Sequence, residues 1–398
     1  MPTNKPTSTN DLLTRSVTDV VPRELAQAKL ASGKKLRVYF GIDPTGARLH
    51  LGHAVPLRKL RAFQEAGHEV ILVIGSFTAM IGDPSGRENA REPLTAKQVR
   101  ENFATYKKQA QLVLDLSKVR VRFNHEWLAK LKFKEVVELA SHFTTQQLME
   151  RDMFQERHQK GQSVGVHELL YPIMVGYDSV VLDVDGEIGG NDQLFNMLCG
   201  RELQRDFKKR DKFVLTTPLI EGTDGRKMSK TYNNAIYLTD EPNDMYGKVM
   251  SIKDGLIVPY LETCTDMAMS EVDAVKAALK RGDNPKQHKA RLAREIVTLY
   301  HSAKAAQAAE AEFNSVHRDK AMPSEIPIVN IPAGKKSLPI TDLLVHTKLA
   351  PSKAQAQRLV EQGGVKVGGN VITDWRAEVA LKSGLVIQVG SRKFARLA

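Results

Sequence analysis

The sequence predicts an α/β protein with a doubly wound parallel sheet, followed by an α-helical domain and a small α+β domain. In the first 240 residues, apolar strand-like runs alternate with helix-like runs, and this alternation favours parallel strands joined by crossover helices. From about Pro242 the periodicity becomes helical, and the last 60 or so residues combine short helices with a hairpin signal. Doubly wound sheets bind ligands at the carboxyl ends of their strands, so the residues that follow each predicted strand are the first candidates for a site.

The N-terminal part supplies these elements in order. Residues 35–43 form a buried strand candidate, which a Pro-Thr-Gly turn ends. A helix is expected from about Gly52, with apolar residues along one side and Gly67 as its C-terminal cap. A second strand, residues 69–75, follows directly. Further strand candidates are residues 118–123, 180–186 and 212–220.

The remaining chain divides into three predicted segments. After a catalytic domain of residues 1–240, we expect a helical domain at 241–320 and a proline-rich linker at 321–337. In the C-terminal domain, 338–398, Ser352 and Gln355 have capping-box spacing and Gly363 can end the same helix. A Gly-Gly pair between two short apolar runs then predicts a hairpin.

Composition excludes several classes of protein. Hydrophobic residues make up 42% and charged residues 26% of the chain, which is typical of a folded domain and not of a disordered one. No apolar run approaches the roughly 20 residues that a membrane helix needs. The N-terminus lacks the apolar core of a signal peptide. The two cysteines, Cys199 and Cys264, form no metal-binding or redox spacing, so we expect a reduced cytoplasmic setting without membrane partners.

The net charge of +12 is unevenly distributed. From Ala333 to the end there are 11 Lys and Arg against 4 Asp and Glu. This concentration of positive charge predicts a C-terminal segment that binds nucleic acid, with an ordinary basic surface as the alternative.

Two histidines, His50 and His53, lie where the first strand gives way to a helix. They could be metal ligands, but no cluster of Cys, Asp or Glu supplies the other ligands at a familiar spacing. They could also be structural histidines without a role. A third interpretation is phosphate binding, because free N–H groups and the dipole at a helix N-terminus favour anions. Thr45 adds a hydroxyl donor, and Gly52 allows a flat ring to approach the backbone.

A glycine-rich polar stretch, residues 222–234, contains Lys227 and Lys230 three positions apart. By itself it could be a solvated loop. A mobile lysine loop can also close over a triphosphate and neutralise the charge that develops during transfer. The two motifs in this order are more specific than either one alone.

Both motifs resemble signatures of one enzyme family. His50-Leu51-Gly52-His53 resembles the "HIGH" signature of class I aminoacyl-tRNA synthetases, and the sequence from Lys227 to Thr231 resembles their "KMSKS" loop. "YFGIDPT", "IGDPSGR" and "IGGNDQLFN" resemble the bacterial tyrosyl-tRNA synthetases in particular, and the C-terminal segment looks like their S4 RNA-binding module. The resemblance implies a Rossmann-like, HUP-type catalytic domain with a dimer-forming insertion, a helical domain on the anticodon side and an S4-like domain.

The resemblance also assigns roles to residues. It implies that the catalytic residues are Thr45, His50, His53, Lys227 and Lys230. The positions that line the ATP site are Gly41, Asp43, Gly52, Asp192, Met228 and Ser229, with Asp192 on the ribose. The tyrosine site is implied to consist of Tyr39, Asp83, Tyr171, Val175, Asp178 and Gln193, with Tyr39 and Asp178 on the phenolic hydroxyl. Contacts to tRNA are implied for Lys353 and Arg358.

The implied activity is that of a tyrosine--tRNA ligase, which first activates L-tyrosine with ATP and then transfers it to the 3′ end of tRNA(Tyr). ATP is expected to arrive with Mg²⁺, no structural metal is expected, and the family implies a homodimer. Val175 departs from the family pattern, which commonly has a glutamine there. The alternatives are a tryptophanyl enzyme, a non-catalytic RNA-binding paralogue and a small-molecule adenylyltransferase.

Overall fold

The computed structural model describes residues 9–85, 94–318, 326–332, 334–390 and 393–398. The chain divides into two compact units, Met1–Gln307 and Ala308–Ala398, and the boundary falls inside one helix, Ala303–Arg318 (α16). Among the described residues, no helix is both long and apolar enough to cross a membrane.

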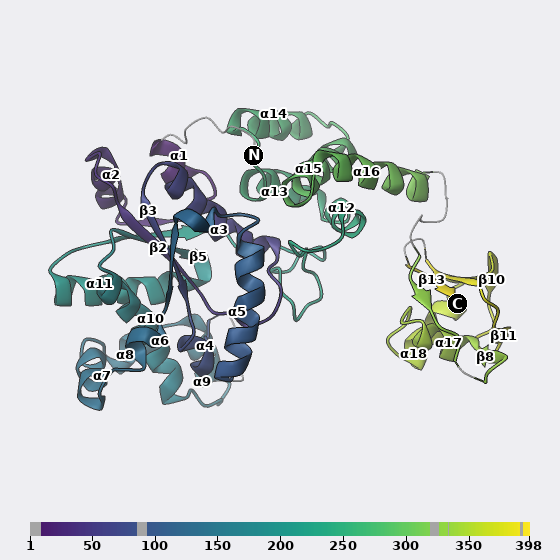
Figure 1. Ribbon diagram of the computed structural model, residues 1–398, viewed down its shortest axis with the longest axis horizontal. Helices are drawn as coiled ribbons and strands as arrows, with labels where there is room; N and C mark the ends of the chain where they lie inside the picture. The colour runs from purple at the N-terminus through teal and green to yellow at the C-terminus, as the bar shows by residue number, and fades with distance from the viewer. Residues whose placement is uncertain (1–8, 86–93, 319–325, 333, 391–392) are drawn as a thin grey trace. The chain divides into compact units, whose positions relative to one another are not determined.

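The first unit is built around a six-stranded sheet (Figure 1). Its strands are β1 (Val20–Val21), β2 (Arg37–Ile42), β3 (Glu69–Ile74), β4 (Val119–Phe123), β5 (Gly186–Gly190) and β6 (Phe213–Thr217). They lie in the order β1-β6-β5-β2-β3-β4, all parallel except β1, which pairs antiparallel with β6 at the edge. The chain order runs outward in both directions from the β2/β5 pair, which makes that pair the topological switch point where ligands bind. The predicted doubly wound sheet is confirmed.

Helices and short 3₁₀ turns connect these strands. The helices before β5 are α1 (Thr9–Thr14), α2 (Arg23–Ala31), α3 (Leu51–Glu65), α4 (Thr78–Ile81), α5 (Ala96–Ala110), α6 (His125–Leu128), α7 (Phe133–Ala140), α8 (Thr145–Met149), α9 (Asp152–Gln159) and α10 (Val166–Leu182). The later ones are α11 (Leu194–Lys208), α12 (Pro242–Met250), α13 (Ile257–Cys264), α14 (Met269–Lys280) and α15 (Pro285–Tyr300). The 3₁₀ turns are η1 (Leu116–Lys118), η2 (Asn191–Gln193) and η3 (Asp254–Leu256).

Side chains of β3 divide the core into two layers. Leu72 and Ile74 face α3 and α5, where they pack near Leu57 and Phe103. Ile71 and Val73 point to the other face and pack with residues of α6 and with Leu182 and Val184 at the end of α10. Period-2 alternation in a strand buried on both faces explains why β3 is apolar throughout. Behind the second layer, α10 packs along α11 (Figure 1).

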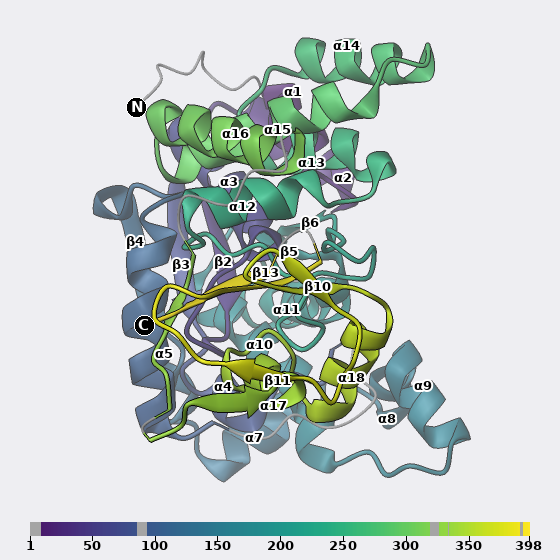
Figure 2. The ribbon, with the colours of Figure 1, turned by 90° about the vertical axis from the view of Figure 1, so that its right-hand side faces the viewer.

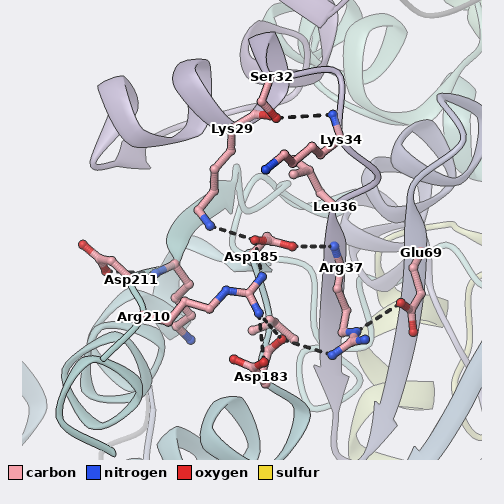
Figure 3. A network of polar contacts seen from close by, with 12 residues as sticks. Lys29, Ser32, Lys34, Leu36, Arg37, Glu69, Asp183, Asp185, Arg210 and Asp211 are labelled. Atoms are coloured by element: carbon pink, nitrogen blue, oxygen red, sulfur yellow. Dashed lines mark hydrogen bonds and ion pairs between the residues drawn. The ribbon is translucent and has the colours of Figure 1, made fainter. Parts of the chain in front are cut away.

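The amino-terminal end of the sheet is fixed by ion pairs (Figure 3). Asp185, just before β5, accepts hydrogen bonds from Lys29 Nζ at 2.7 Å, from the backbone N–H of Arg37 at 2.9 Å and from Arg210 Nη2 at 2.5 Å. Arg37 in turn pairs with Glu69 at 3.1 Å. These contacts tie the starts of β2, β3 and β5 together, so the opposite, carboxyl ends of the strands are held in register around the switch point.

One predicted strand is wrong. Residues 180–182 continue α10 as a helix, which ends at Asp183 with a left-handed φ of 48°. Periodicity alone cannot distinguish a short buried strand from a buried stretch of helix. Here the chain stays helical because Val180 and Leu182 continue the packed side of α10. The real strand, β5, was missed because it is rich in glycine. Gly186 is needed there because a Cβ would collide with the ring of Phe213.

The helical region is confirmed. α12 begins at Pro242, where the sequence predicted the change, and Pro occupies a first-turn position in which its missing N–H is not needed. In this bundle, α12 and α13 both pack against α15, and α14 packs against α13. The basic residues predicted to flank α15 are partly paired: Lys289 contacts Asp254 at 2.6 Å and Arg291 contacts Glu271 at 2.6 Å.

The second unit, whose sheets are yellow and light green in Figure 2, combines the end of α16 with two small sheets and two further helices. Its elements are β7 (Ile328–Val329), β8 (Ser337–Pro339), α17 (Ile340–His346), α18 (Lys353–Glu361), β9 (Val365–Val367), β10 (Asn370–Ile372), β11 (Glu378–Ala380), β12 (Val386–Val389) and β13 (Lys393–Leu397). The predicted hairpin is β9–β10, whose turn glycines, 368 and 369, have φ of 56° and 88°. The predicted cap is also confirmed, since Ser352 Oγ accepts from the N–H of Gln355 at 3.3 Å.

Part of the predicted linker belongs to this fold. β7 pairs in parallel with β13, and β8, which begins at Ser337, pairs with β11. The linker prediction is therefore wrong for these strands, because strands of two or three residues are too short to leave a periodic pattern between prolines. Residues 319–325, where the linker was expected to begin, lie outside the described residues. The division of the first unit into a sheet domain and a helical domain stays a prediction.

Candidate active site

A cavity of about 1190 Å³ opens at the switch point of the first unit. Its walls include the carboxyl ends of β2 and β5 and the segments that follow them, together with the start of α3 and the lysine loop, residues 222–234. This is the place where a doubly wound sheet binds its ligand.

Most of the predicted site residues line this one cavity. Those on its wall are Gly41, Asp43, Thr45, His50, Gly52, His53, Asp83, Tyr171, Val175, Asp178, Asp192, Gln193, Lys227, Met228, Ser229 and Lys230. Tyr39 is not on the wall, and Lys353 and Arg358 belong to the second unit. The sequence motifs, which lie up to 189 positions apart, are thus brought together by the sheet and its loops.

The two histidines stack at the N-terminus of α3. Their ring centroids lie 3.7 Å apart, and the backbone N–H of His50 donates to Nδ1 of His53 at 3.2 Å. The His50 ring lies against Gly52, where an added Cβ would be 3.0 Å from two of its atoms. A larger residue at position 52 would therefore press on the His50 ring, and the flat ring that approaches this glycine is that of His50.

His50 is a neutral donor or acceptor at neutral pH. It is 7% exposed, and burial, followed by the charges of Lys230 and Lys227, lowers its pKa to about 3. Its Nδ1 atom is buried and has no hydrogen-bond partner among the residues that the structure describes. An unsatisfied polar atom in the wall of a cavity is a position where a ligand can bind, because leaving it unpaired costs free energy.

The lysine loop is folded around Asn234. The side-chain amide of Asn234 donates to Asp224 Oδ1 at 2.7 Å and to the carbonyl of Lys227 at 3.1 Å, and its oxygen accepts from the N–H of Ser229 at 2.8 Å. Asn234 is 2% exposed. The sequence assigns no role to Asn234, because no spacing rule identifies an asparagine that closes a loop on itself.

Both lysines of the loop point to the cavity. Lys227 Nζ lies 2.8 Å from Oδ2 of Asp192, which follows β5. Lys230 lies against Gly46, where a Cβ would collide with its ammonium group, and its Nζ is 5.8 Å from the centre of the Tyr106 ring. Two cations and two histidines therefore form one end of the cavity, with the chemistry that binds a polyphosphate.

The other end of the cavity is rich in carboxylates. Asp83 accepts a hydrogen bond from Gln193 Nε2 at 2.9 Å and from the N–H of Ser85 at 2.9 Å. Ser85 is held by the buried Arg151, whose Nη2 donates to its Oγ at 2.6 Å, and Gln193 is held by Asn196 at 2.8 Å. Arg151, which precedes α9, and Asn196, which lies in α11, were missed, since single residues leave no motif. The arrangement fixes a carboxylate beside a cavity, which suits an ammonium group.

Asp178 is buried and accepts hydrogen bonds from two side chains that the sequence analysis missed. Trp127 Nε1 donates at 2.8 Å and Asn124 Nδ2 at 3.4 Å. Asp178 is 3% exposed, and burial raises its pKa well above the usual range while those two donors oppose the shift. Asn124 directly follows β4, so its place at a strand end was the signal that could have found it. Asp43, assigned to ATP, accepts from the Tyr171 hydroxyl at 2.9 Å and from Thr78 Oγ1 at 2.7 Å.

Tyr39 lies behind the wall. It is 1% exposed, its ring packs in the core with Ile71 and Val73, and its hydroxyl forms a 3.0 Å hydrogen bond with Ser179 Oγ. Ser179, the neighbour of Asp178 in the chain, thus supplies a buried partner for the Tyr39 hydroxyl, and the shared contact of Tyr39 and Asp178 with a ligand stays a prediction.

The predicted tRNA residues lie on α18 and are exposed. Lys353 Nζ pairs with Asp342 at 2.5 Å. In the part of the chain that the structure describes, no group of three or more His, Cys, Asp or Glu side chains could hold a metal ion.

The site joins two features of one class of enzyme: a doubly wound sheet with histidines at its switch point, and a lysine loop that closes the same cavity. Residues 31–318 match the family model of tRNA synthetases class I (W and Y), and residues 319–393 match that of the tyrosine--tRNA ligase SYY-like C-terminal domain. The chain belongs to the class I tRNA synthetases of the W and Y family. Within this family, its full-length relatives are tyrosine--tRNA ligases.

Those relatives are similar over nearly their whole length. The chain is 45% identical to the tyrosine--tRNA ligase of Moorella thermoacetica over 97% of its own length and 94% of the relative's. It is 44% identical to the tyrosine--tRNA ligase of Thermotoga maritima over 97% of its own length and 96% of that relative's. Among solved structures, the tyrosyl-tRNA synthetase of Archaeoglobus fulgidus complexed with L-tyrosine matches 77% of this chain and 100% of that one, with a TM-score of 0.62 at 22% identity. That structural likeness supports the fold.

Proposed function

We infer that the chain is a tyrosine--tRNA ligase that uses ATP. The observation that carries this inference is the single cavity in which the histidine pair and the two loop lysines face a carboxylate-lined end. Polyphosphate chemistry at one end and amino-acid chemistry at the other are what the activation of an amino acid by ATP requires. Close relatives with this activity span nearly the full chain.

In the first step the tyrosine carboxylate attacks the α-phosphorus of ATP. A carboxylate–phosphate bond forms, the bond to the bridging oxygen breaks, and pyrophosphate leaves with the electron pair. No proton has to be removed, because the nucleophile is already an anion, so catalysis consists of positioning and charge stabilisation. Lys227 and Lys230 supply positive charge for the phosphates. His50, His53 and Thr45 supply hydrogen bonds, and the low pKa of His50 means that it acts as a neutral group.

The nucleotide and the amino acid are proposed to occupy different ends. Gly41, Gly52, Met228 and Ser229 are proposed to lie along the nucleotide, with Asp192 on the ribose, while Asp43 supports the site through Tyr171. Asp83, Tyr171 and Gln193 are proposed to hold the ammonium group of tyrosine, and Asp178 its phenolic hydroxyl. Val175 lies on the same wall without a donor or acceptor. Tyr39, which lies behind the cavity wall, is proposed to support the tyrosine site through its hydrogen bond with Ser179.

Mg²⁺ is proposed to enter with ATP. The described residues offer no cage of carboxylates for it, and this fits an ion held mainly by the phosphates of the substrate. When bound there, the ion would neutralise phosphate charge alongside Lys227 and Lys230.

In the second step a ribose hydroxyl at the 3′ end of tRNA(Tyr) attacks the carbonyl carbon of the adenylate, and AMP leaves. The second unit is proposed to bind the tRNA through Lys353, Arg358 and other basic residues, chiefly by phosphate contacts. The predicted homodimer is supported by Phe133 and Val137 of α7, which are 83% and 52% exposed, because a monomer gains nothing from exposing such side chains side by side on one helix. The cytoplasm, where these substrates occur, is the proposed location.

The test is pyrophosphate exchange into ATP without tRNA, with tyrosine, phenylalanine or tryptophan in turn. Exchange that depends on tyrosine alone is expected. Exchange driven by tryptophan would overturn the choice of substrate, and exchange with none of the three would favour the alternative of a non-catalytic RNA-binding paralogue. Charging of tRNA(Tyr) then tests the second step separately.

A further inference from the structure

A buried lysine lies beneath the carboxylate end of the cavity. Lys212, just before β6, is 0% exposed, and its Nζ donates to Ser179 Oγ at 2.5 Å and to Oε2 of Glu187 on β5. The same Nζ lies 5.5 Å from the centre of the Tyr39 ring, and the Tyr39 hydroxyl bonds the other side of Ser179. None of the motifs accounts for Lys212 or Glu187.

The space for this lysine is made by a glycine. A Cβ at Gly200 of α11 would lie 2.7 Å from Ser179 Oγ and 2.9 Å from Lys212 Nζ. Gly200 also faces Gly176 of α10, where a Cβ would meet the Gly200 backbone nitrogen at 2.9 Å. The two helices therefore approach closely enough to enclose the ammonium group, and no other residue fits at either position without a shift. The lysine is built into the fold and does not reach in from the surface.

Two buried carboxylates lie near this single buried lysine. Two carboxylates, Glu187 and Asp178, line the inner part of the cavity, and each is 3% exposed. Two carboxylates in one dry site disfavour each other's ionised form, and one of them then keeps its proton. Glu187 contributes to raising the pKa of Asp178, after the larger effect of burial. Lys212 and Glu187 together form a net-neutral pair, in which Lys212 and Ser179 both donate to Oε2 of Glu187.

We propose that Lys212 is a specificity-determining positioning residue for the substrate hydroxyl: by pairing with Glu187 it neutralises that carboxylate and leaves Asp178, whose described partners Trp127 and Asn124 are uncharged, as the anionic acceptor for the hydroxyl. This rests on the proposed function. Without the pair, Glu187 becomes a second bare carboxylate, Asp178 retains a proton, and its own O–H then competes with the substrate O–H for acceptors. Tyrosine thereby loses its advantage over phenylalanine, which offers Asp178 no hydroxyl in the intact protein.

The experiment compares Lys212→Met with the double variant Lys212→Met/Glu187→Gln in the full-length protein. Pyrophosphate exchange gives KM for tyrosine, KM for ATP and the ratio of kcat/KM for tyrosine over phenylalanine. For Lys212→Met we expect the tyrosine KM to rise at least tenfold, the ATP KM to change less than threefold, and the ratio to fall at least tenfold. In the double variant, which removes both charges and keeps similar volumes, the tyrosine KM and the ratio should return to within about threefold of the parent.

Lys59→Met is the matched control, because Lys59 is another buried lysine, 4% exposed, but its Nζ caps the carbonyls of Asp11 and Leu12 away from the cavity. It should lower thermal stability and leave the ratio unchanged. If Lys212→Met does not fold, Lys212→Gln, which keeps a polar head for Ser179, is measured in its place.

The inference is overturned if the folded Lys212 variant keeps the tyrosine KM and the ratio within threefold, if both KM values rise together, or if the double variant remains as impaired as the single one. A parent protein that shows no tyrosine-dependent exchange contradicts the proposed function instead, before any variant is compared.

Discussion

Lys227 Nζ lies 2.8 Å from Oδ2 of Asp192, so an ion pair joins the lysine loop to the end of β5 across the mouth of the cavity. The two side chains are 45% and 23% exposed, and pairs this exposed contribute little net stability. In the proposed function, a nucleotide would therefore replace the pair at small cost, with its phosphates contacting Lys227 and its ribose contacting Asp192.

Replacing Lys227 should impair activation and not the binding of tyrosine. Loss of one preorganised charge from a transition state typically costs about 10²–10³ in kcat, and we expect Lys227→Ala to fall in that range. The measurement is tyrosine-dependent pyrophosphate exchange. Lys276→Ala, on the exposed side of α14, is the control and should be unaffected. A kcat within threefold of the parent would show that Lys227 does not contact the reacting phosphates.

Asn234 should control the lysine loop. Its amide makes four hydrogen bonds, to Asp224, Ser229 and two loop carbonyls, and each typically contributes about 0.5–1.5 kcal/mol. Asn234→Ala is expected to reduce kcat/KM for ATP about 10- to 100-fold, with the tyrosine KM unchanged. Asn233→Gly is a suitable control, because Asn233 is exposed and its φ of 51° is one that glycine adopts easily. Equal effects at the two positions would contradict the assignment.

Val175 should limit the affinity for tyrosine. It lies on the cavity wall where the family pattern has a glutamine, and a hydrogen bond to a substrate group that is otherwise unpaired contributes about 1–3 kcal/mol. Val175→Gln is therefore expected to lower the tyrosine KM about 5- to 100-fold. Val175→Met has similar length and no amide, so it separates polarity from size. An unchanged KM in Val175→Gln, or an equal gain in Val175→Met, would reject this explanation.

His50 should make stability depend on acid pH. Its folded-state pKa of about 3 is below the ordinary value of 6.5, with burial as the main cause. Above pH 6.5 neither the folded nor the unfolded state binds the proton, and this stability is fully present. Below pH 6.5 the unfolded state takes up the proton first, so stability falls until about pH 3, by on the order of 3 kcal/mol between pH 6.5 and 4.

Urea denaturation at these two pH values, in the parent and in His50→Asn, isolates that contribution. The variant should lose less stability on acidification than the parent. An equal loss of stability in both proteins would mean that protonation of His50 does not cause the loss.

The second unit should affect charging of tRNA and not activation. Lys353→Ala and Arg358→Ala are each expected to raise the KM for tRNA(Tyr) about 3- to 10-fold and to weaken its dependence on salt, because a phosphate contact is lost. Asp342→Asn, which removes the carboxylate paired with Lys353, should act in the opposite direction. Pyrophosphate exchange is the internal control for all three variants. A change in exchange, or the same direction of effect for Asp342→Asn, would argue against direct tRNA contacts.

The sequence predicted the parts of this fold that repeat a period or carry turn chemistry. β2, β3, β4 and β6 are where the apolar runs predicted them, and the hairpin at Gly368 and Gly369 forms as expected. The sequence-based prediction failed at residues 180–186 and at β5, where local pattern and tertiary packing disagree. A glycine-rich strand has low intrinsic preference for its structure, and it forms because Phe213 and Met197 fill the space left by the missing side chains.

The sequence by itself determined the chemistry at the cationic end of the cavity, because the histidine and lysine motifs each lie in one short segment whose spacing is visible. Tertiary structure alone decided which single residues support the carboxylate end. Asn124 and Trp127 lie 54 and 51 positions from Asp178, and Arg151 lies 66 positions from Ser85, so they meet their partners only when the sheet and helices pack. Lys212 and Glu187 are of this kind as well: a buried charge is tolerated only beside its partner, and that proximity exists only in the folded chain.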